Sequence, residues 1–109
     1  MLFSYSLLSG KNDEFKNLIT ECQQYITERS ENQAESKLKE TAEFWNKNKK
    51  LYRIFVDGSY CETLSESLSM AEISLKIKEN ADTVKSLNEC KSTLNHILDK
   101  EKLSFETVL

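Results

Sequence analysis

The sequence predicts an all-α fold, an antiparallel bundle of about four helices built as two helical hairpins. Pro is absent and Gly occurs only at Gly10 and Gly58, so the chain lacks the turn residues that a many-stranded sandwich or barrel needs. Apolar residues recur at helical spacing in four segments, which short polar stretches separate. Amphipathic helices joined by short turns favour antiparallel neighbours. The 109 residues suffice for one domain with a single core.

Residues 1–10 form a separate apolar segment. The run MLFSYSLLSG is shorter than the roughly 18 residues of a membrane span, and it lacks the basic lead-in of a signal peptide. We expect it to be an N-terminal arm or the remnant of a membrane anchor. Residues 11–109 are then the single helical-bundle domain.

The first predicted helix covers residues 12–29. Asn12 suits the N-cap position, and Asp13 and Glu14 suit the positive end of the helix dipole. An apolar face follows at helical spacing, made of Phe15, Leu18, Ile19, Cys22, Tyr25 and Ile26.

The second predicted helix covers residues 33–56 and begins with a capping box formed by Ser30 and Gln33. It has two apolar stripes, a pattern typical of a helix flanked on both sides. We therefore expect it to be the central post of the domain, with Trp45 in the core. One stripe comprises Ala34, Leu38, Ala42, Trp45, Tyr52 and Val56, and the other comprises Phe44, Leu51 and Phe55.

The third predicted helix covers residues 60–79, after a capping box of Ser59 and Glu62. The fourth follows a polar turn at residues 80–82 and reaches about residue 100. We expect the tail, with Leu103 and Phe105, to fold back on the bundle. The third helix has Cys61, Leu64, Leu68, Ala71 and Leu75 on its stripe with Met70, Ile73 and Ile77 alongside, and the fourth has Val84, Leu87, Cys90, Leu94 and Leu98.

No pattern of reactive residues predicts an enzyme, and we expect no cofactor or metal. His96 is the only histidine, so a di-metal site with Glu-x-x-His on two helices cannot form. A structural histidine near a helix end and a single-site metal or pH role both stay open for His96. Cys22, Cys61 and Cys90 lack the close spacing of zinc ligands. We expect buried free thiols; the alternative is one disulfide and one free thiol.

The charged residues give one candidate contact site. A net charge of −3 provides no electrostatic footprint for nucleic acid, so we expect no nucleic-acid partner. Lys47, Lys49, Lys50 and Arg53 form a basic cluster that could contact an acidic partner or anionic lipid headgroups. They also occupy the C-terminal half of a helix, where the dipole favours cations, so a structural role is the alternative.

Several features occur in an order typical of a bacterial family. Trp45 is followed by the segment 53–57 (Arg-Ile-Phe-Val-Asp), the Leu-rich third helix, the segment 94–97 (Leu-Asn-His-Ile), and a Lys-Leu-Ser-x-Glu-x-x-Leu ending at Leu109. In these features roughly two thirds of the chain resembles the domain of unknown function 4363, found mainly in clostridia and relatives. In that family a His commonly follows the Phe-Val/Ile-Asp segment, whereas here the position is Gly58. Any site built on that His is then absent, and the turn should be more flexible.

The resemblance implies an all-helical domain, usually preceded by one N-terminal membrane anchor, with no assigned activity. We therefore expect a non-catalytic domain that binds another protein at a bacterial membrane or cell envelope. It would lie on the extracytoplasmic face if an anchor precedes it, and otherwise in the cytoplasm. The second hypothesis is a small-ligand or lipid site between the helices, formed by Trp45, Phe44 and Phe55 with Lys49 and Lys50 as anionic counterpart. A homo-oligomer is a further option.

Overall fold

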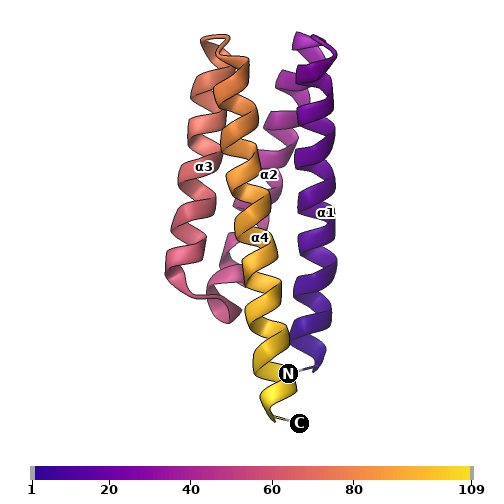
Figure 1. Cartoon of the computed structure of the whole chain (residues 1–109), viewed down its shortest axis with the longest axis vertical. Helices are drawn as coiled ribbons and strands as arrows, with labels where there is room; N and C mark the ends of the chain where they lie inside the picture. The colour runs from indigo at the N-terminus through magenta and orange to yellow at the C-terminus, as the bar shows by residue number, and fades with distance from the viewer. Residues whose placement is uncertain (1, 109) are drawn as a thin grey trace.

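A computed structural model describes residues 2–108, with side chains described for residues 6–100. These residues form four α-helices and no strand. Neighbouring helices alternate in direction, and both termini lie at one end of the bundle (Figure 1). The predicted all-α, antiparallel four-helix bundle is therefore confirmed. The helices are α1 (Leu2–Thr27), α2 (Glu31–Phe55), α3 (Gly58–Lys76) and α4 (Asn80–Val108).

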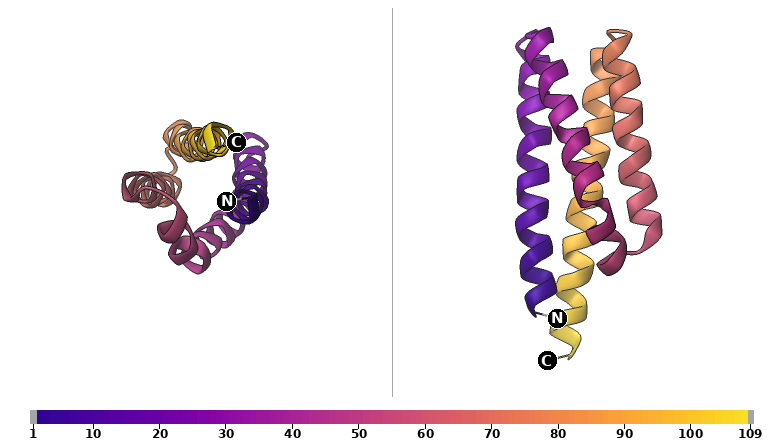
Figure 2. Two further views of the ribbon diagram at one scale, coloured as in Figure 1. Left: turned by 90° about the horizontal axis from the view of Figure 1, so that it is seen from below. Right: turned by 180° about the vertical axis from the view of Figure 1, so that it is seen from behind.

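The four helices surround one elongated core, in a molecule of 47 × 21 × 21 Å. Each helix packs against two others, α1 against α2 and α4, and α3 against α2 and α4. The expectation that the second helix is a central post is therefore wrong. In addition, α2 runs obliquely: it lies beside α1 near the α1–α2 turn and crosses towards α3 at its other end (Figure 2).

The first helix begins well before Asn12, so the predicted N-cap at this residue is wrong. The helix passes through Gly10, and the side chains of Leu8 and Asn12 are completely buried. The buried positions follow a strict four-three alternation that continues through Asn12 back to Leu8. Because a helix keeps such positions on one face, Asn12 points into the core. The buried face of α1 comprises Leu8, Asn12, Phe15, Ile19, Cys22 and Ile26.

Asn12 is satisfied inside the core by two other helices. Its Nδ2 donates a hydrogen bond to the carbonyl oxygen of Leu94, 3.0 Å away, and its Oδ1 accepts one from the hydroxyl of Tyr52. Burial raises the pKa of the Tyr52 phenol, so its hydroxyl keeps its proton and remains a donor. One amide thereby joins α1, α2 and α4 in a defined register.

The turn between α1 and α2 and the turn between α3 and α4 have the same backbone hydrogen bonds. At the end of α1 the N–H of Arg29 donates to the carbonyl of Ile26, and that of Ser30 donates to Tyr25. At the end of α3 Lys78 and Glu79 donate in the same pattern. Arg29 and Lys78 adopt the left-handed conformation, with φ of 60° and 62°. This arrangement is a Schellman motif, which satisfies the free carbonyls at a helix end.

Three further predicted boundaries are corrected. Ser30 occupies the N-cap of α2, but its side chain makes no capping hydrogen bond. The turn expected at residues 80–82 lies earlier, because α4 already begins at Asn80. The tail does not turn back: α4 continues to Val108, although the side chains of Leu103 and Phe105 lie outside the described part.

The N-cap of α3 is Asp57 rather than Ser59. A carboxylate oxygen of Asp57 accepts hydrogen bonds from the backbone N–H and the hydroxyl of Ser59, both at 3.0 Å, and these bonds lower the pKa of Asp57.

We expect Asp57→Ala to lower the midpoint temperature of thermal unfolding, because the first turn of α3 loses its cap. Asp57→Asn should retain most of the stability, since asparagine caps equally well. Thermal unfolding followed by circular dichroism tests this, and equal loss in both variants would contradict it.

Candidate functional site

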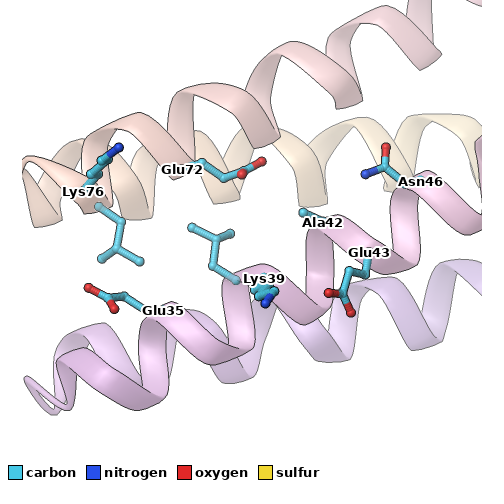
Figure 3. A pocket seen from close by; sticks show the side chains of 9 residues that line it. Glu35, Lys39, Ala42, Glu43, Asn46, Glu72 and Lys76 are labelled. Carbon is cyan, nitrogen blue, oxygen red and sulfur yellow. The ribbon is translucent and has the colours of Figure 1, made fainter.

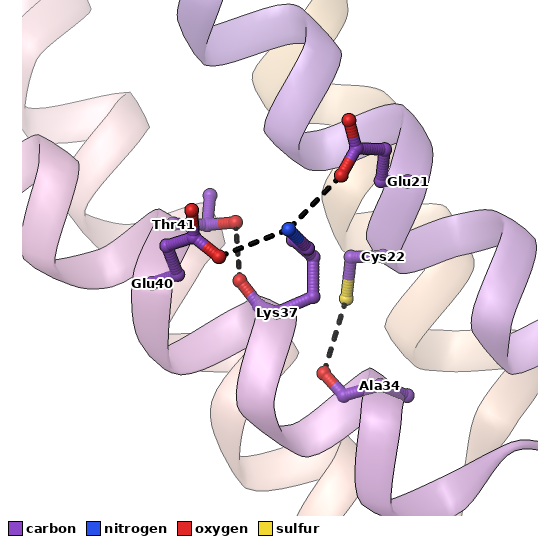
Figure 4. A network of polar contacts seen from close by, with 6 residues as sticks. All are labelled: Glu21, Cys22, Ala34, Lys37, Glu40 and Thr41. Atoms are coloured by element: carbon purple, nitrogen blue, oxygen red, sulfur yellow. Dashed lines mark hydrogen bonds and ion pairs between the residues drawn. The ribbon is translucent and has the colours of Figure 1, made fainter.

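Side-chain interactions close the contact surface between α1 and α2. Lys37 of α2 pairs with Glu21 of α1 at 3.0 Å and with Glu40 at 2.9 Å (Figure 4). Hydrogen bonds to Glu40 and Glu21 raise the pKa of Lys37, so it stays charged. The thiol of Cys22 lies 3.6 Å from the carbonyl oxygen of Ala34. These contacts bridge α1 and α2 near the turn that joins them.

The contact surface between α1 and α4 is closed by polar side chains. Lys16 Nζ donates to Asn95 Oδ1 at 3.1 Å. Gln23 Nε2 donates to Asn88 Oδ1 at 2.8 Å and to a backbone carbonyl of α4. Between these two contacts, Lys91 Nζ lies 3.4 Å from the hydroxyl of Thr20. These bonds join residues 16–23 of α1 to residues 84–95 of α4, the two longest helices.

The contact surface between α2 and α3 is open by comparison. Within the described side chains, a single hydrogen bond joins these helices, from Trp45 Nε1 to Ser65 Oγ at 2.8 Å. A groove runs beside this bond between α2 and α3. Its larger part lies towards the α1–α2 and α3–α4 turns, where the ribbon of α2 leans away from α3 (Figure 2). The wide part has a volume of about 530 Å³. A narrower part of about 280 Å³ continues past Trp45.

The wide part of the groove, here called the α2–α3 groove, has an apolar floor and charged rims. Leu38, Ala42 and Leu75 form the floor. Among residues 6–100, Lys37 makes both of the ion pairs within 4.0 Å. The charged side chains on the rims of the groove therefore form no ion pair within this part of the chain. Figure 3 shows the rims, with Glu35, Lys39, Glu43 and Asn46 on α2 and Glu72 and Lys76 on α3.

The structure divides the predicted basic cluster between two hollows on the α3 side of α2 and the exposed surface of that helix. Lys49 is half-buried beside Trp45 in the narrow part of the groove. Arg53 lines a separate hollow together with Glu62 and Glu66. Lys47 and Lys50 are exposed elsewhere on α2. Lys49 and Arg53, four residues apart, both face α3, whereas Lys47 and Lys50 line neither hollow, so a shared contact with an anionic partner stays a prediction.

The aromatic residues of the predicted ligand site also separate. Trp45 is almost completely buried, and its ring packs on Phe15 and Tyr52 at centroid distances of 6.0 and 5.4 Å. Phe44 instead faces α1, where it contacts Phe15 at 5.2 Å. Phe55 lies at the far end of α2, by the turn into α3. The expectation that Trp45 is a core residue is confirmed, and of the three aromatics only Trp45 lines the groove.

The potentially reactive residues lie apart and are poorly activated. Cys22, Cys61 and Cys90 are buried free thiols, as predicted. Burial raises the pKa of Cys22 to about 11 and that of Cys90 to about 12, so both remain protonated at neutral pH. His96 is exposed on α4. Within the part of the chain that the structure describes, no three His, Cys, Asp or Glu side chains gather closely enough to hold a metal ion.

One feature of α3 was not predicted from the sequence. Met70, Ile73 and Ile77 were expected beside the core stripe, but their side chains are 55%, 57% and 63% exposed. They lie on the side of α3 opposite to the buried Leu64 and Leu68. The signal was present in the spacing, because these three residues fall half a turn away from the core positions.

A comparison with family models identifies the chain. Residues 2–108 match the family described as Domain of unknown function (DUF4363). A search of curated proteins and a search of solved structures gave no match. None of the helices within residues 2–108 is both long enough and apolar enough to cross a membrane. Because the family model covers nearly the whole chain, this protein belongs to the DUF4363 family.

Proposed function

We propose that this protein is a non-catalytic interaction domain that binds a helix of another protein in the α2–α3 groove. The observation that carries the proposal is the contrast between the three surfaces where helices meet around α1 and α2. An ion pair closes the surface between α1 and α2, and hydrogen bonds close the surface between α1 and α4. The surface between α2 and α3 is instead an open groove with an apolar floor. An amphipathic helix laid into an apolar groove is a recurrent mode of protein recognition.

The charges of the groove define the kind of helix that fits. Glu35 and Lys39 stand on one rim, and Glu72 and Lys76 stand on the other. A helix with a narrow apolar stripe would cover Leu38 and Leu75, while mixed acidic and basic residues beside its stripe would pair with the rims. A nucleic acid would meet two carboxylates among these four groups, which opposes its binding.

Binding rather than catalysis is also supported by the state of the reactive groups. The thiols of Cys22 and Cys90 are protonated at neutral pH and shielded from solvent. The carboxylates around the groove alternate with lysines on the helix surfaces. A nucleophile next to a base, or two acids with separated pKa values, would be expected for hydrolytic chemistry.

The groove variant Ala42→Arg is expected to reduce capture of the partner strongly. Ala42 is half-buried in the groove floor, so an arginine would fill the space that the partner helix needs without opening the core. We expect the amount captured from the native membrane fraction to fall roughly tenfold or more, as for other changes at the centre of an interface. Quantitative mass spectrometry of the captured proteins measures it.

The matched control is Ser36→Arg, which places the same side chain on an exposed position of α2 outside the groove. It should capture the same protein as the wild type. A protein captured equally by both variants binds elsewhere and does not support the groove. A wild-type chain that captures nothing specific from either the membrane or the soluble fraction of its cells would contradict the proposal.

The resemblance to membrane-anchored relatives supports a place at the bacterial membrane, on its extracytoplasmic face. Leu8 of the apolar N-terminal segment packs in the core of the bundle. Fractionation of cells that produce the protein from its full reading frame tests this point. Recovery in the soluble cytoplasmic fraction would contradict the membrane location and leave the groove proposal standing.

A small-ligand or lipid site is the second candidate function, and one observation favours it. Trp45 lines the narrow part of the groove together with Lys49, so an anionic ligand could reach both the ring and the ammonium group. Binding there would change the emission of the only tryptophan in the chain. An unchanged spectrum across a panel of lipids and metabolites would exclude this site.

A further inference from the structure

Three large apolar side chains form a line on the outer face of α3. Met70, Ile73 and Ile77 follow one another at spacings of three and four residues, and each is more than half exposed. Single exposed apolar residues are common on protein surfaces and need no explanation. A row on one helix face is different, because it leaves a continuous apolar strip in water and marks an interaction surface. We call it the α3 strip.

We propose that the α3 strip binds the α3 strip of a second copy of this chain, forming a two-fold symmetric dimer with antiparallel α3 helices. The charges at the two ends of the strip point to this occupant. Glu66 lies one turn before Met70, and Lys76 directly precedes Ile77. Both are exposed. The strip is therefore acidic at one end and basic at the other, so it is complementary to itself when one copy is reversed.

The spacing of the residues fixes the register of the pair. Glu66, Met70, Ile73 and Ile77 alternate by four, three and four residues, as in the seam of a coiled coil. In an antiparallel seam Met70 of one copy faces Ile73 of the other. This register brings Lys76 of one copy close to Glu66 of the other, and the symmetry gives the contact twice. A parallel pair would instead place Glu66 against Glu66, which is unfavourable.

The geometry also sets the expected strength of the dimer. The 19 residues of α3 span about 28 Å, so one helix pair buries an area at the low end of specific interfaces. We expect a dissociation constant on the order of micromolar. Met70, Ile73 and Ile77 do not line the α2–α3 groove, whereas Lys76 borders both surfaces, so the dimer and the groove partner would share this lysine.

Sedimentation velocity over a concentration series tests the dimer directly. We expect the wild-type chain to shift from monomer to dimer as its concentration rises, and Ile73→Glu to remain a monomer at every concentration. The matched control is Ile54→Glu, which makes the same change at a residue that is 73% exposed at the end of α2. This control should dimerise like the wild type. Circular dichroism confirms that each variant is folded.

A charge exchange tests the antiparallel register. Glu66→Lys and Lys76→Glu should each weaken the dimer roughly tenfold, because each replaces two attractive contacts by repulsive ones. The double variant Glu66→Lys/Lys76→Glu should restore it, since the pattern is then reversed but still complementary. A wild-type chain that is monomeric at all concentrations, or a dimer unaffected by Ile73→Glu, would overturn the proposal. Failure of the double variant to restore the dimer would overturn the antiparallel register.

Discussion

Replacing Phe15 with alanine is expected to lower the free energy of unfolding by about 3–5 kcal/mol, the usual cost of removing a buried aromatic ring. Phe15 is completely buried, and its ring lies between Phe44 and Trp45 at centroid distances of 5.2 and 6.0 Å. These contacts join α1 to α2 at mid-length, and the short residue would leave a cavity there. Chemical denaturation followed by Trp45 fluorescence and circular dichroism measures the loss.

The scale of this effect is set by the small stability of single domains, about 5–15 kcal/mol in total. The variant should therefore be folded only at low temperature or low denaturant concentration. The control is Ile54→Ala at the exposed end of α2, which should change the unfolding free energy by less than about 0.5 kcal/mol. A loss below about 1 kcal/mol for Phe15→Ala would show that this aromatic cluster does not hold α1 against α2.

The buried amide is expected to behave differently from the apolar core. Asn12→Leu removes the acceptor of the Tyr52 hydroxyl and should cost about 1–3 kcal/mol, because that hydroxyl is left buried without a partner. Tyr52→Phe should also destabilise, since Asn12 Oδ1 then loses its donor. The double variant Asn12→Leu/Tyr52→Phe should recover much of the loss, because both polar partners are gone.

A double-mutant cycle of unfolding free energies measures this coupling. Asn32→Leu, at an exposed position of α2, controls for the substitution itself and should have little effect. Additive losses in the double variant would contradict a direct interaction between Asn12 and Tyr52. They would also remove the reason for treating this amide as the group that sets the register of three helices.

Much of the fold follows from the sequence because the apolar spacing is regular. The alternation of Phe15, Ile19, Cys22 and Ile26 predicts α1, and the buried thiol of Cys22 follows from its place on that face. The start of α1 was missed because Asn12 resembles an N-cap. Its position in the same alternation, one turn after Leu8, is the stronger signal. A polar residue in a core register is satisfied only by long-range partners, which the sequence does not reveal.

The candidate site was harder to predict, because it depends on how whole helices are placed. The α2–α3 groove exists because α2 tilts away from α3, and no local pattern around Ala42 or Leu75 encodes that tilt. The basic residues were grouped by proximity in sequence, yet Lys49 and Arg53 face α3 while Lys50 does not. Helical spacing alone is enough to place these residues on different faces of α2. It does not show which face of α2 borders an open groove.

Site-specific photocrosslinking in cells tests the proposed groove most directly. A photoreactive residue would be placed at Lys39 on the groove rim, and in a second variant at Thr20 on the closed side between α1 and α4. We expect the Lys39 position to crosslink to one other protein, and the Thr20 position to give no such product. Equal crosslinking from both positions, or none from Lys39 while the chain is folded, would contradict the claim that a protein partner binds between α2 and α3.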